Sequence, residues 1–351
     1  MRVVFLGTPE FAIPALQKLI GWPKCQVVAV ITQIDKPSGR GHKLQPPPVK
    51  VLAEEQGIPV FQPIKLSKSP EIVEALQALK PDILVTAAFG QILRKNILEL
   101  APLGVVNVHA SLLPQYRGAA PINWALANGE TQTGITTMFS DPGIDTGAML
   151  LKRSIDIDQD INAIELGHKL SEIGGELLIE TLEALDSGKL VPIAQDNELA
   201  SYAPMLKKEM AFIDWTWPAY KIHNHIRGMQ PWPGSVTTYD GINLKLLRSR
   251  ISKSSDINAL MNACAHDMDI STTSKNLLPG SLIVNRTGVF VCCGPAGKDL
   301  LELLEVQPPN KGKMKAHDWA NGLHLNNSQG KLRFQPNLAI SPQQNQTVGE
   351  K

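Results

Sequence analysis

Short apolar runs alternate with helical patterns through the first half of the chain. Apolar runs that predict buried strands lie at residues 3–6, 26–32, 60–61, 82–87 and 105–111. The segments between them that have the spacing of helices lie at residues 9–20, 49–56 and 70–79. Thr8 is expected to cap the first of these helices, ahead of Pro9. Strict alternation of strand and helix predicts a doubly wound, mostly parallel, Rossmann-like sheet with helices on both faces.

The same unit continues with a helix at 119–128 and strands at 134–139 and 149–157. A long amphipathic pattern at 162–187 predicts the helix that closes the first domain, which we place at residues 1–187. Residues 188–204 contain scattered prolines and little periodicity, which indicates a linker over the surface.

The second half of the chain has a different pattern. A helix is predicted at 219–229, and short apolar segments with Gly and Pro between them lie at 236–239, 244–248, 281–284, 289–293 and 301–307. This spacing favours a small C-terminal β-barrel, OB-like, at residues 205–335. Trp215, Trp217 and Trp232 are predicted to be core, with stacking on nucleic-acid bases as the alternative. Residues 252–275 form a polar insertion without a recognisable pattern, and residues 336–351 are predicted to be a disordered tail.

Length and charge divide the chain in the same way. With 351 residues the chain is long for one core, so two domains are expected. Residues 1–204 contain 17 Lys and Arg against 22 Asp and Glu, a net charge of −5, whereas residues 205–335 contain 16 against 10, a net charge of +6. A basic second half is suited to a polyanion such as nucleic acid, and an ordinary solvated basic face is the other interpretation.

The remaining composition points to a cytoplasmic enzyme. The four cysteines show neither Cys-x-x-Cys spacing nor a metal-like pairing with histidine, which indicates buried or free thiols in a reducing compartment and no metal. The N-terminal apolar run is short and reads as a strand, not a signal peptide. No apolar stretch approaches the roughly 18 residues that a membrane span needs.

Candidate chemistry is concentrated at the end of the strand that contains Val105. Alternation along a strand puts Asn107 and His109 on one face. Asp145 lies in the Pro/Gly-rich turn Asp141-Pro-Gly-Ile-Asp145-Thr-Gly147, and such a loop can return a carboxylate to a histidine. An amide that holds an oxyanion, an imidazole that exchanges a proton and a carboxylate that orients it suit acyl-type transfer. A purely structural role for each residue remains the alternative.

The sequence around these residues resembles that of the folate-dependent formyltransferases. The matching segments are Asn107-Val-His109-Ala-Ser111-Leu-Leu-Pro114, Arg117-Gly-Ala-Ala-Pro-Ile-Asn123 and the Asp141 to Gly147 turn. The resemblance implies that Asn107, His109 and Asp145 are catalytic. It also implies that Ser111, Leu112, Leu113 and Pro114 lie against a folate, 10-formyltetrahydrofolate, used as co-substrate.

A second folate segment follows the strand at 82–87. Phe89-Gly-Gln91-Ile92-Leu93 is similar to the family segment that frames the pterin, which makes Phe89, Gln91, Ile92 and Leu93 cofactor-binding candidates. This chain has Phe89 in place of the usual tyrosine and Arg94 in place of the usual proline. A simple core or helix-start role is the alternative.

The long polar loop from Asp35 to Pro48 makes the resemblance specific to one family of formyltransferases. Its Lys-Pro-x-Gly-Arg40-Gly-x-Lys43-Leu pattern resembles a loop of the methionyl-tRNA formyltransferases that enters the acceptor end of initiator tRNA. The resemblance therefore implies tRNA contacts for Arg40 and Lys43. In the basic second half we expect Lys207 and Lys208 to contact phosphates.

The resemblance implies formyl transfer from 10-formyltetrahydrofolate to the α-amino group of methionyl initiator tRNA, for translation initiation, by a monomer. Two rivals remain open. A related formyltransferase or hydrolase would use the same three side chains on a nucleotide, a sugar amine or water. An RNA-binding module with an inactive site would need no chemistry, although all three catalytic positions are filled.

Overall fold

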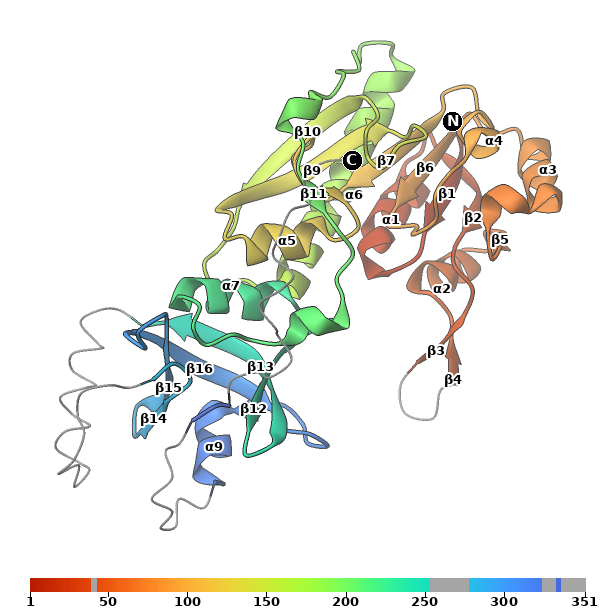
Figure 1. Cartoon of the computed structure of the whole chain (residues 1–351). Coiled ribbons are helices and arrows are strands. Elements are labelled where there is room, and N and C mark those ends of the chain that lie inside the picture. The colour runs from red at the N-terminus through yellow and green to blue at the C-terminus, as the bar shows by residue number, and fades with distance from the viewer. Residues whose placement is uncertain (39–42, 253–277, 324–332, 336–351) are drawn as a thin grey trace, which may run out of the picture. The chain divides into compact units, whose positions relative to one another are not determined.

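The computed structural model describes residues 1–38, 43–252, 278–323 and 333–335 (Figure 1). Two compact units are present. The first contains residues 1–125, 131–159 and 164–205, and the second contains 126–130, 160–163 and the chain from 206 onward. In the described ranges, no helix combines the length and the apolar character needed to cross a bilayer.

The first unit is built on one twisted sheet. Its strands in chain order are β1 (Arg2–Gly7), β2 (Gln26–Ile31), β5 (Val60–Phe61), β6 (Ile83–Ala87), β7 (Val105–His109), β9 (Gln132–Phe139) and β10 (Met149–Asp156). Their spatial order is β10-β9-β7-β6-β1-β2-β5. The pairs from β5 to β7 are parallel, and β9 and β10 are antiparallel additions. The predicted doubly wound, mostly parallel sheet is therefore confirmed.

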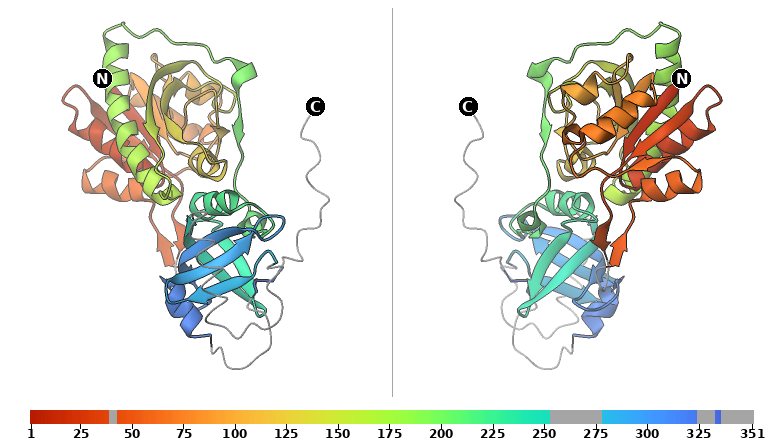
Figure 2. Two further views of the ribbon diagram at one scale, coloured as in Figure 1. Left: turned by 90° about the vertical axis from the view of Figure 1, so that its left-hand side faces the viewer. Right: turned by 90° about the vertical axis from the view of Figure 1, so that its right-hand side faces the viewer.

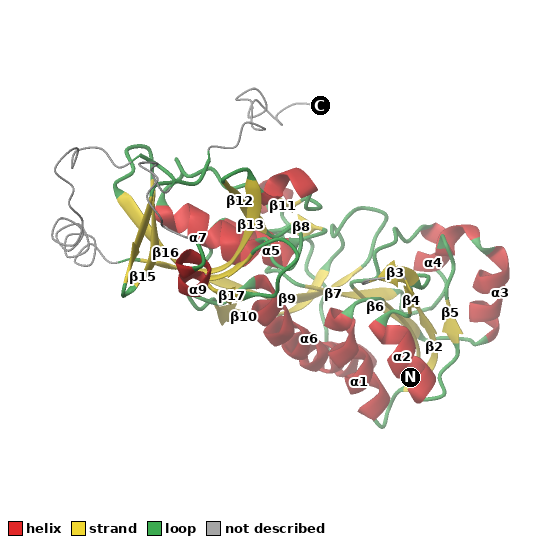
Figure 3. Cartoon of the chain, turned by 90° about the horizontal axis from the view of Figure 1, so that it is seen from below, coloured by secondary structure: helices red, strands yellow, loops and turns green. Residues whose placement is uncertain are grey.

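Helices cover both faces of this sheet. Figure 3 shows α1 (Ile13–Gly21), α2 (Pro48–Glu55) and α6 (Ala163–Asp186) gathered along one side. Glycines at 174 and 175 let α6 approach Val108 of the sheet and the backbone of Pro14 in α1. On the other face, α3 (Pro70–Ala78) and α4 (Lys95–Leu98) pack into an apolar cluster with residues of β1, β2 and β6. Burial on both faces explains the continuous apolar runs of these strands.

Two local predictions in this unit are wrong. The first helix begins as a 3₁₀ turn, Glu10–Ala12, that Pro9 precedes without a side-chain cap. The Thr8 hydroxyl instead donates to the Phe89 carbonyl at 3.1 Å. The predicted loop at 35–48 contains a hairpin, β3 (Lys36–Ser38) and β4 (Lys43–Gln45), because its backbone groups pair with each other. Arg40 lies outside the described residues.

The shorter elements of the first unit are the turns η2 (Leu66–Lys68) and η3 (Asn197–Leu199), the helix α5 (Pro121–Ala127) and the strands β8 (Arg117–Gly118) and β11 (Tyr202–Ala203). The last two pair in parallel. Residues 190–204, which we call the connecting segment, thus contain regular structure where the sequence indicated a plain linker.

The second unit has an antiparallel sheet, seen from two sides in Figure 2. Its strands are β12 (Ser235–Tyr239), β13 (Ile242–Ile251), β14 (Leu282–Asn285), β15 (Gly288–Cys293), β16 (Asp299–Gln307) and β17 (Met314–Lys315). Its helical elements are η4 (Lys208–Ala211), α7 (Ala219–Gly228) and α9 (Ala316–Asn321). The small barrel expected from the sequence is confirmed.

Aromatic residues fill the core of this unit. Trp215 is buried and stacks on Phe334, with ring centroids 5.2 Å apart, and Trp217 packs against the same core. Trp232 is 54% exposed, so the prediction of a core role is wrong for that residue. Nearly all of the 252–275 insertion and the whole tail at 336–351 lie outside the described residues.

Candidate active site

The candidate site lies where the strand order of the first sheet reverses. From β1 the chain moves first to β2 on one side and later to β6 and β7 on the other. In open parallel sheets, ligands bind beyond the carboxyl ends of the strands at such a point. The carboxyl ends of β6 and β7 supply the first residues of the site.

Strand register aligns the side chains that face the site. Asn107 on β7 pairs with Thr86 on β6 and with Met138 on β9, so these three lie on one rung of the sheet. His109, two residues further along β7, lies on the same face. Val108 faces the opposite side, toward α6. The alternation predicted for this strand is therefore present.

Asp145 enters from a tight turn between β9 and β10. Its backbone is in the left-handed region, with φ of 53°. Asp and Asn are among the few non-glycine residues that adopt this region readily. The carboxylate of Asp141 holds the start of the turn, accepting from the backbone nitrogen of Gly143 at 3.1 Å and the hydroxyl of Thr146 at 2.7 Å. The turn is thus built to present a carboxylate in one direction.

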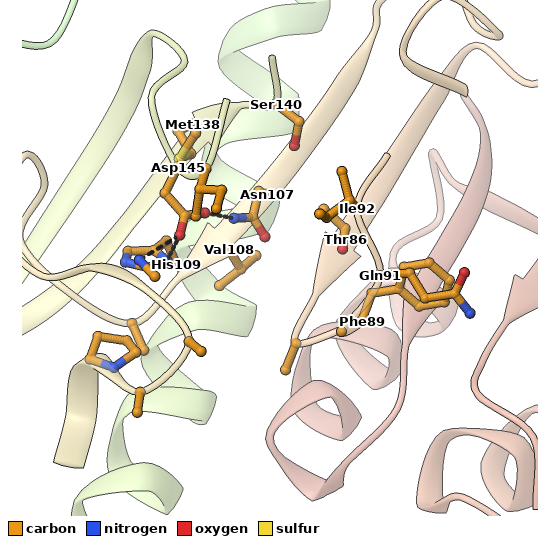
Figure 4. Close-up of a pocket in the computed structure, with 18 of the residues that line it drawn as sticks. Thr86, Phe89, Gln91, Ile92, Asn107, Val108, His109, Met138, Ser140 and Asp145 are labelled. Carbon is orange, nitrogen blue, oxygen red and sulfur yellow. Dashed lines mark hydrogen bonds and ion pairs between the residues drawn. The ribbon is translucent and has the colours of Figure 1, made fainter. Parts of the chain in front are cut away.

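The three predicted catalytic side chains meet around the Asp145 carboxylate. Its Oδ1 accepts from Asn107 Nδ2 at 3.3 Å, and its Oδ2 lies 3.6 Å from His109 Nδ1. The backbone nitrogen of Gly118 donates to Oδ2 at 2.9 Å. Figure 4 shows Asp145 between Asn107 and His109. The His109 side chain is 6% exposed and that of Asp145 is 17% exposed, so solvent would screen the attraction between a protonated His109 and Asp145 only weakly.

The tautomer of His109 follows from its other contact. Its Nε2 lies 2.9 Å from the backbone carbonyl oxygen of Tyr116. A carbonyl only accepts hydrogen bonds, so Nε2 must hold a hydrogen. In the neutral imidazole Nδ1 is then the basic atom, and it is the atom that faces Asp145. Nδ1 is therefore the ring atom of the neutral imidazole that can accept a proton.

A cavity of about 600 Å³ opens beside these residues. Its lining comes from the segments 86–93, 107–110, 118–123 and 138–145, together with Phe11 and Met205. Figure 4 shows Thr86, Phe89, Gln91 and Ile92 across the cavity from His109. An apolar wall next to a few polar groups is typical of a site for a flat organic ligand.

The candidate folate residues divide into two groups. Phe89, Gln91, Ile92 and Leu93 line the cavity. The side-chain amide of Gln91 is hydrogen-bonded to the backbone. Its Oε1 accepts from Leu66 N at 2.8 Å and its Nε2 donates to the Pro63 carbonyl at 3.1 Å. Phe89 is 3% exposed and Ile92 is 73% exposed, so Ile92 is the one at the mouth.

The segment Ser111, Leu112, Leu113 and Pro114 does not line the cavity in the part of the chain that the structure describes. Ser111 donates to the Gln115 carbonyl at 2.6 Å, and Leu113 packs with Met138 and Met149. The side chains of Ser111 and Leu113 therefore make their contacts with other parts of the protein.

Sequence reasoning missed several residues of the site. Thr86, Met138, Ser140 and Met205 line the cavity, and the Gly118 nitrogen bonds to Asp145. Thr86 is the polar residue in an apolar strand, and pairing β6 with β7 in register would have found it. The Gly118 contact is made by the backbone, which has no signal in the sequence.

The candidate tRNA residues lie in different parts of the chain. Lys207 and Lys208 are exposed at the start of the second unit. Lys43 begins β4, and Arg40 lies outside the described residues.

The fold and the site define a formyl transferase. The formyl transferase family model matches residues 1–182, and the model of the formyl transferase C-terminal domain matches residues 205–324. Among solved structures, the chain is similar to WlaRD, a sugar 3N-formyl transferase, with a TM-score of 0.60 and 17% identity, covering 89% of this chain and 99% of that one. At that identity the likeness shows a shared fold.

Curated relatives share a higher sequence identity with this chain than that solved structure does. The chain is 48% identical to the methionyl-tRNA formyltransferase of Trichlorobacter lovleyi over 322 residues, 92% of this chain and 94% of the relative. It is 53% identical to that of Pelobacter propionicus over 250 residues, 71% of this chain and 78% of the relative. The chain therefore belongs to the methionyl-tRNA formyltransferase family.

Proposed function

We propose that this enzyme transfers a formyl group from 10-formyltetrahydrofolate to the α-amino group of methionyl initiator tRNA. The observation that supports this most directly is the convergence of Asn107 and His109 on the Asp145 carboxylate beside a cavity that suits a folate. Membership of the family supports the choice of substrates, and the arrangement of the three side chains supports the type of reaction.

The folate supplies an activated formyl carbon next to the nitrogen that leaves. We place its ring system against Phe89, Ile92 and Leu93, where an aromatic and aliphatic wall matches a flat heterocycle. Ser111 to Pro114 would contribute from behind, by fixing the end of β7. The donors Asn107 and His109 then lie at the formyl end of the cavity.

Asn107 and His109 divide the work at the reacting carbon. When the amine attacks, negative charge develops on the formyl oxygen, and the second hydrogen of the Asn107 amide would stabilise it. Nδ1 of His109 would exchange the proton that the amine loses and the leaving nitrogen gains. Asp145 would orient the imidazole and stabilise its charged form. The bond to the methionyl nitrogen would form first, and the carbon–nitrogen bond to the folate would break as the oxyanion collapses and the leaving nitrogen gains the proton.

The basic residues would serve the RNA. Lys207 and Lys208 are exposed and free to neutralise phosphates, and Arg40 and Lys43 would contact the acceptor end of the tRNA. The cytoplasm, where folate and charged tRNA are present, would be the site of action, and one chain would suffice for the reaction. The domain at residues 1–187 would provide the catalytic side chains, residues 188–204 would link it to the next domain, and residues 205–335 would bind the tRNA.

A direct test is a competition between acceptors. The enzyme would receive 10-formyltetrahydrofolate with charged initiator tRNA, charged elongator methionine tRNA or an amino sugar nucleotide. We expect rapid formylation of the initiator tRNA alone. Formylation of the sugar amine, or hydrolysis of the folate without transfer, would identify a related activity instead. Binding of tRNA without any transfer would identify an RNA-binding module.

A further inference from the structure

The connecting segment contacts the candidate site through one inward side chain. From Val191 to Leu199 every residue is exposed except Gln195, which is partly buried. Figure 2 shows this stretch as the extended green chain that follows α6. A linker with no role beyond connection would not be expected to turn one amide inward.

The Gln195 amide is bonded on both sides. Its Nε2 donates to the carbonyl oxygens of Asp145 and Gly147, each at 2.8 Å, and its Oε1 accepts from Nε of Arg117 at 2.9 Å. Carbonyls only accept and a guanidinium only donates, so the orientation of the amide is fixed by its partners. One side chain thus holds the backbone carbonyls of Asp145 and Gly147, on either side of Thr146.

Arg117 fixes Gln195 from behind. It is 2% exposed, and its Nη2 donates to Asn197 Oδ1 at 3.0 Å. Among the described residues, no carboxylate lies within ion-pair distance of this guanidinium. Burying a cation against neutral amides is costly, and an apolar pair of similar size would be cheaper for stability alone. The arrangement therefore points to a requirement for orientation.

The connecting segment also holds the partners of the other site residues. Pairing of β8 with β11 fixes Gly118, whose nitrogen donates to Asp145, and Ala119 N donates to the Ala203 carbonyl at 2.8 Å. The hydroxyl of Ser201 accepts from Tyr116 N at 2.9 Å, and the Tyr116 carbonyl in turn holds His109. Several bonds from one segment thus converge on the catalytic side chains.

We infer that Gln195 is a positioning residue for Asp145, and that Arg117 acts one step further back by orienting the Gln195 amide. This inference rests on the proposed catalytic role of Asp145. The left-handed backbone at Asp145 lies in a region that few non-glycine residues adopt, so neighbouring contacts must hold the turn in place. The two bonds from Gln195 hold it at the carbonyls on either side of Thr146, and so direct the carboxylate at His109.

The main test replaces the donor without changing its shape. In Gln195→Glu, an oxygen faces the two carbonyls while the acceptor for Arg117 remains. We expect kcat for formyl transfer to fall about 10- to 100-fold, because small displacements of catalytic groups have effects of this size. KM for the folate and for the tRNA should change less than about threefold. Gln195→Leu, which lacks both functions, should show the same division between kcat and KM. Gln77→Glu, at an exposed position on α3, is the matched control and should leave both constants unchanged.

A double substitution separates positioning from a general structural role. If Gln195 acts only through Asp145, Gln195→Glu should have almost no further effect on the single-turnover rate when Asp145→Asn is already present. An equal loss in both backgrounds would overturn the inference. So would normal kcat in both Gln195→Glu and Gln195→Leu while Asp145→Asn is slow. Near-normal activity of Asp145→Asn alone would instead remove the proposed catalytic trio, so the two failures are distinguishable.

Discussion

Nε2 of His109 donates to the backbone carbonyl of Tyr116 across 2.9 Å, so Nδ1 is the ring atom of the neutral imidazole that can take up a proton. A glutamine at position 109 can place its amide nitrogen near the position of Nε2 and keep this bond, but it cannot take up a proton. We therefore expect His109→Gln to lower kcat by about 10²- to 10⁴-fold with little change in thermal stability. Turnover and melting temperature measured on the same preparation check this. Turnover near that of the unsubstituted enzyme would show that His109 exchanges no proton.

The Asp145 turn should tolerate no added methyl group at its far end. A Cβ on Gly147 would lie 1.9 Å from the Phe139 carbonyl oxygen, so Gly147→Ala must displace one of the two backbones. We expect a loss of about 1–3 kcal/mol in the free energy of unfolding and a lower kcat. Gly21→Ala is the control, because a Cβ there meets nothing within 4 Å. Equal behaviour of the two variants in urea unfolding and in steady-state assays would contradict the packing described for this turn.

Salt should reveal whether Lys207 and Lys208 contact phosphates. Each lost phosphate contact reduces the slope of log affinity against log salt by about 0.7 to 0.9, so replacing both lysines with serine should flatten the slope by about 1.5. Filter binding or fluorescence titration of tRNA over a range of salt concentrations measures it. Lys95→Ser, on an exposed lysine at the start of α4 that pairs with Glu99, is the control and should leave the slope unchanged.

Burial of His225 gives the second unit a defined response to acid. Desolvation lowers the pKa of His225 from 6.5 to about 4, with the Met210 carbonyl bond opposing the shift and Lys221 adding to it. Between those values the unfolded chain binds a proton that the folded chain does not, so the free energy of unfolding falls as the pH is lowered from 6.5 to 4. At about 1.4 kcal/mol per pH unit, the limit is roughly 3 kcal/mol.

Urea unfolding followed by tryptophan fluorescence at several pH values checks this response, since Trp217 lies against the His225 ring. His225→Gln should flatten the pH dependence in this range, and His168→Gln, at an exposed position on α6, should not. An unchanged dependence in His225→Gln would assign the acid response to other groups.

The sequence was sufficient to predict the structure wherever a single strand or a single periodic pattern determines the fold locally. Alternation on β7 places Asn107 and His109 on one face, and apolar runs without alternation mark a sheet covered on both sides. The pattern of Pro and Gly around Asp145 marks a turn, because few other residues allow one there.

Sequence patterns gave no guide where backbone groups or residues distant in sequence determine the local structure. The folate contact expected for Ser111 stays a prediction, and no local pattern shows that its hydroxyl donates to the Gln115 carbonyl four residues later. The connecting segment looked passive because its prolines break periodicity, whereas its order comes from pairing with β8, more than 80 residues earlier. No local pattern could show that Gln195 and Asp145 are neighbours.

The pairing of β11 with β8 decides where the chain can be cut. A fragment that stops at the end of α6 would retain every proposed catalytic side chain and yet lack Gln195, Ser201 and Ala203. Such a truncation would be an inadequate stand-in for the catalytic half of the molecule, and kinetic dissection of the two halves should divide the polypeptide after Met205, where the first compact unit ends.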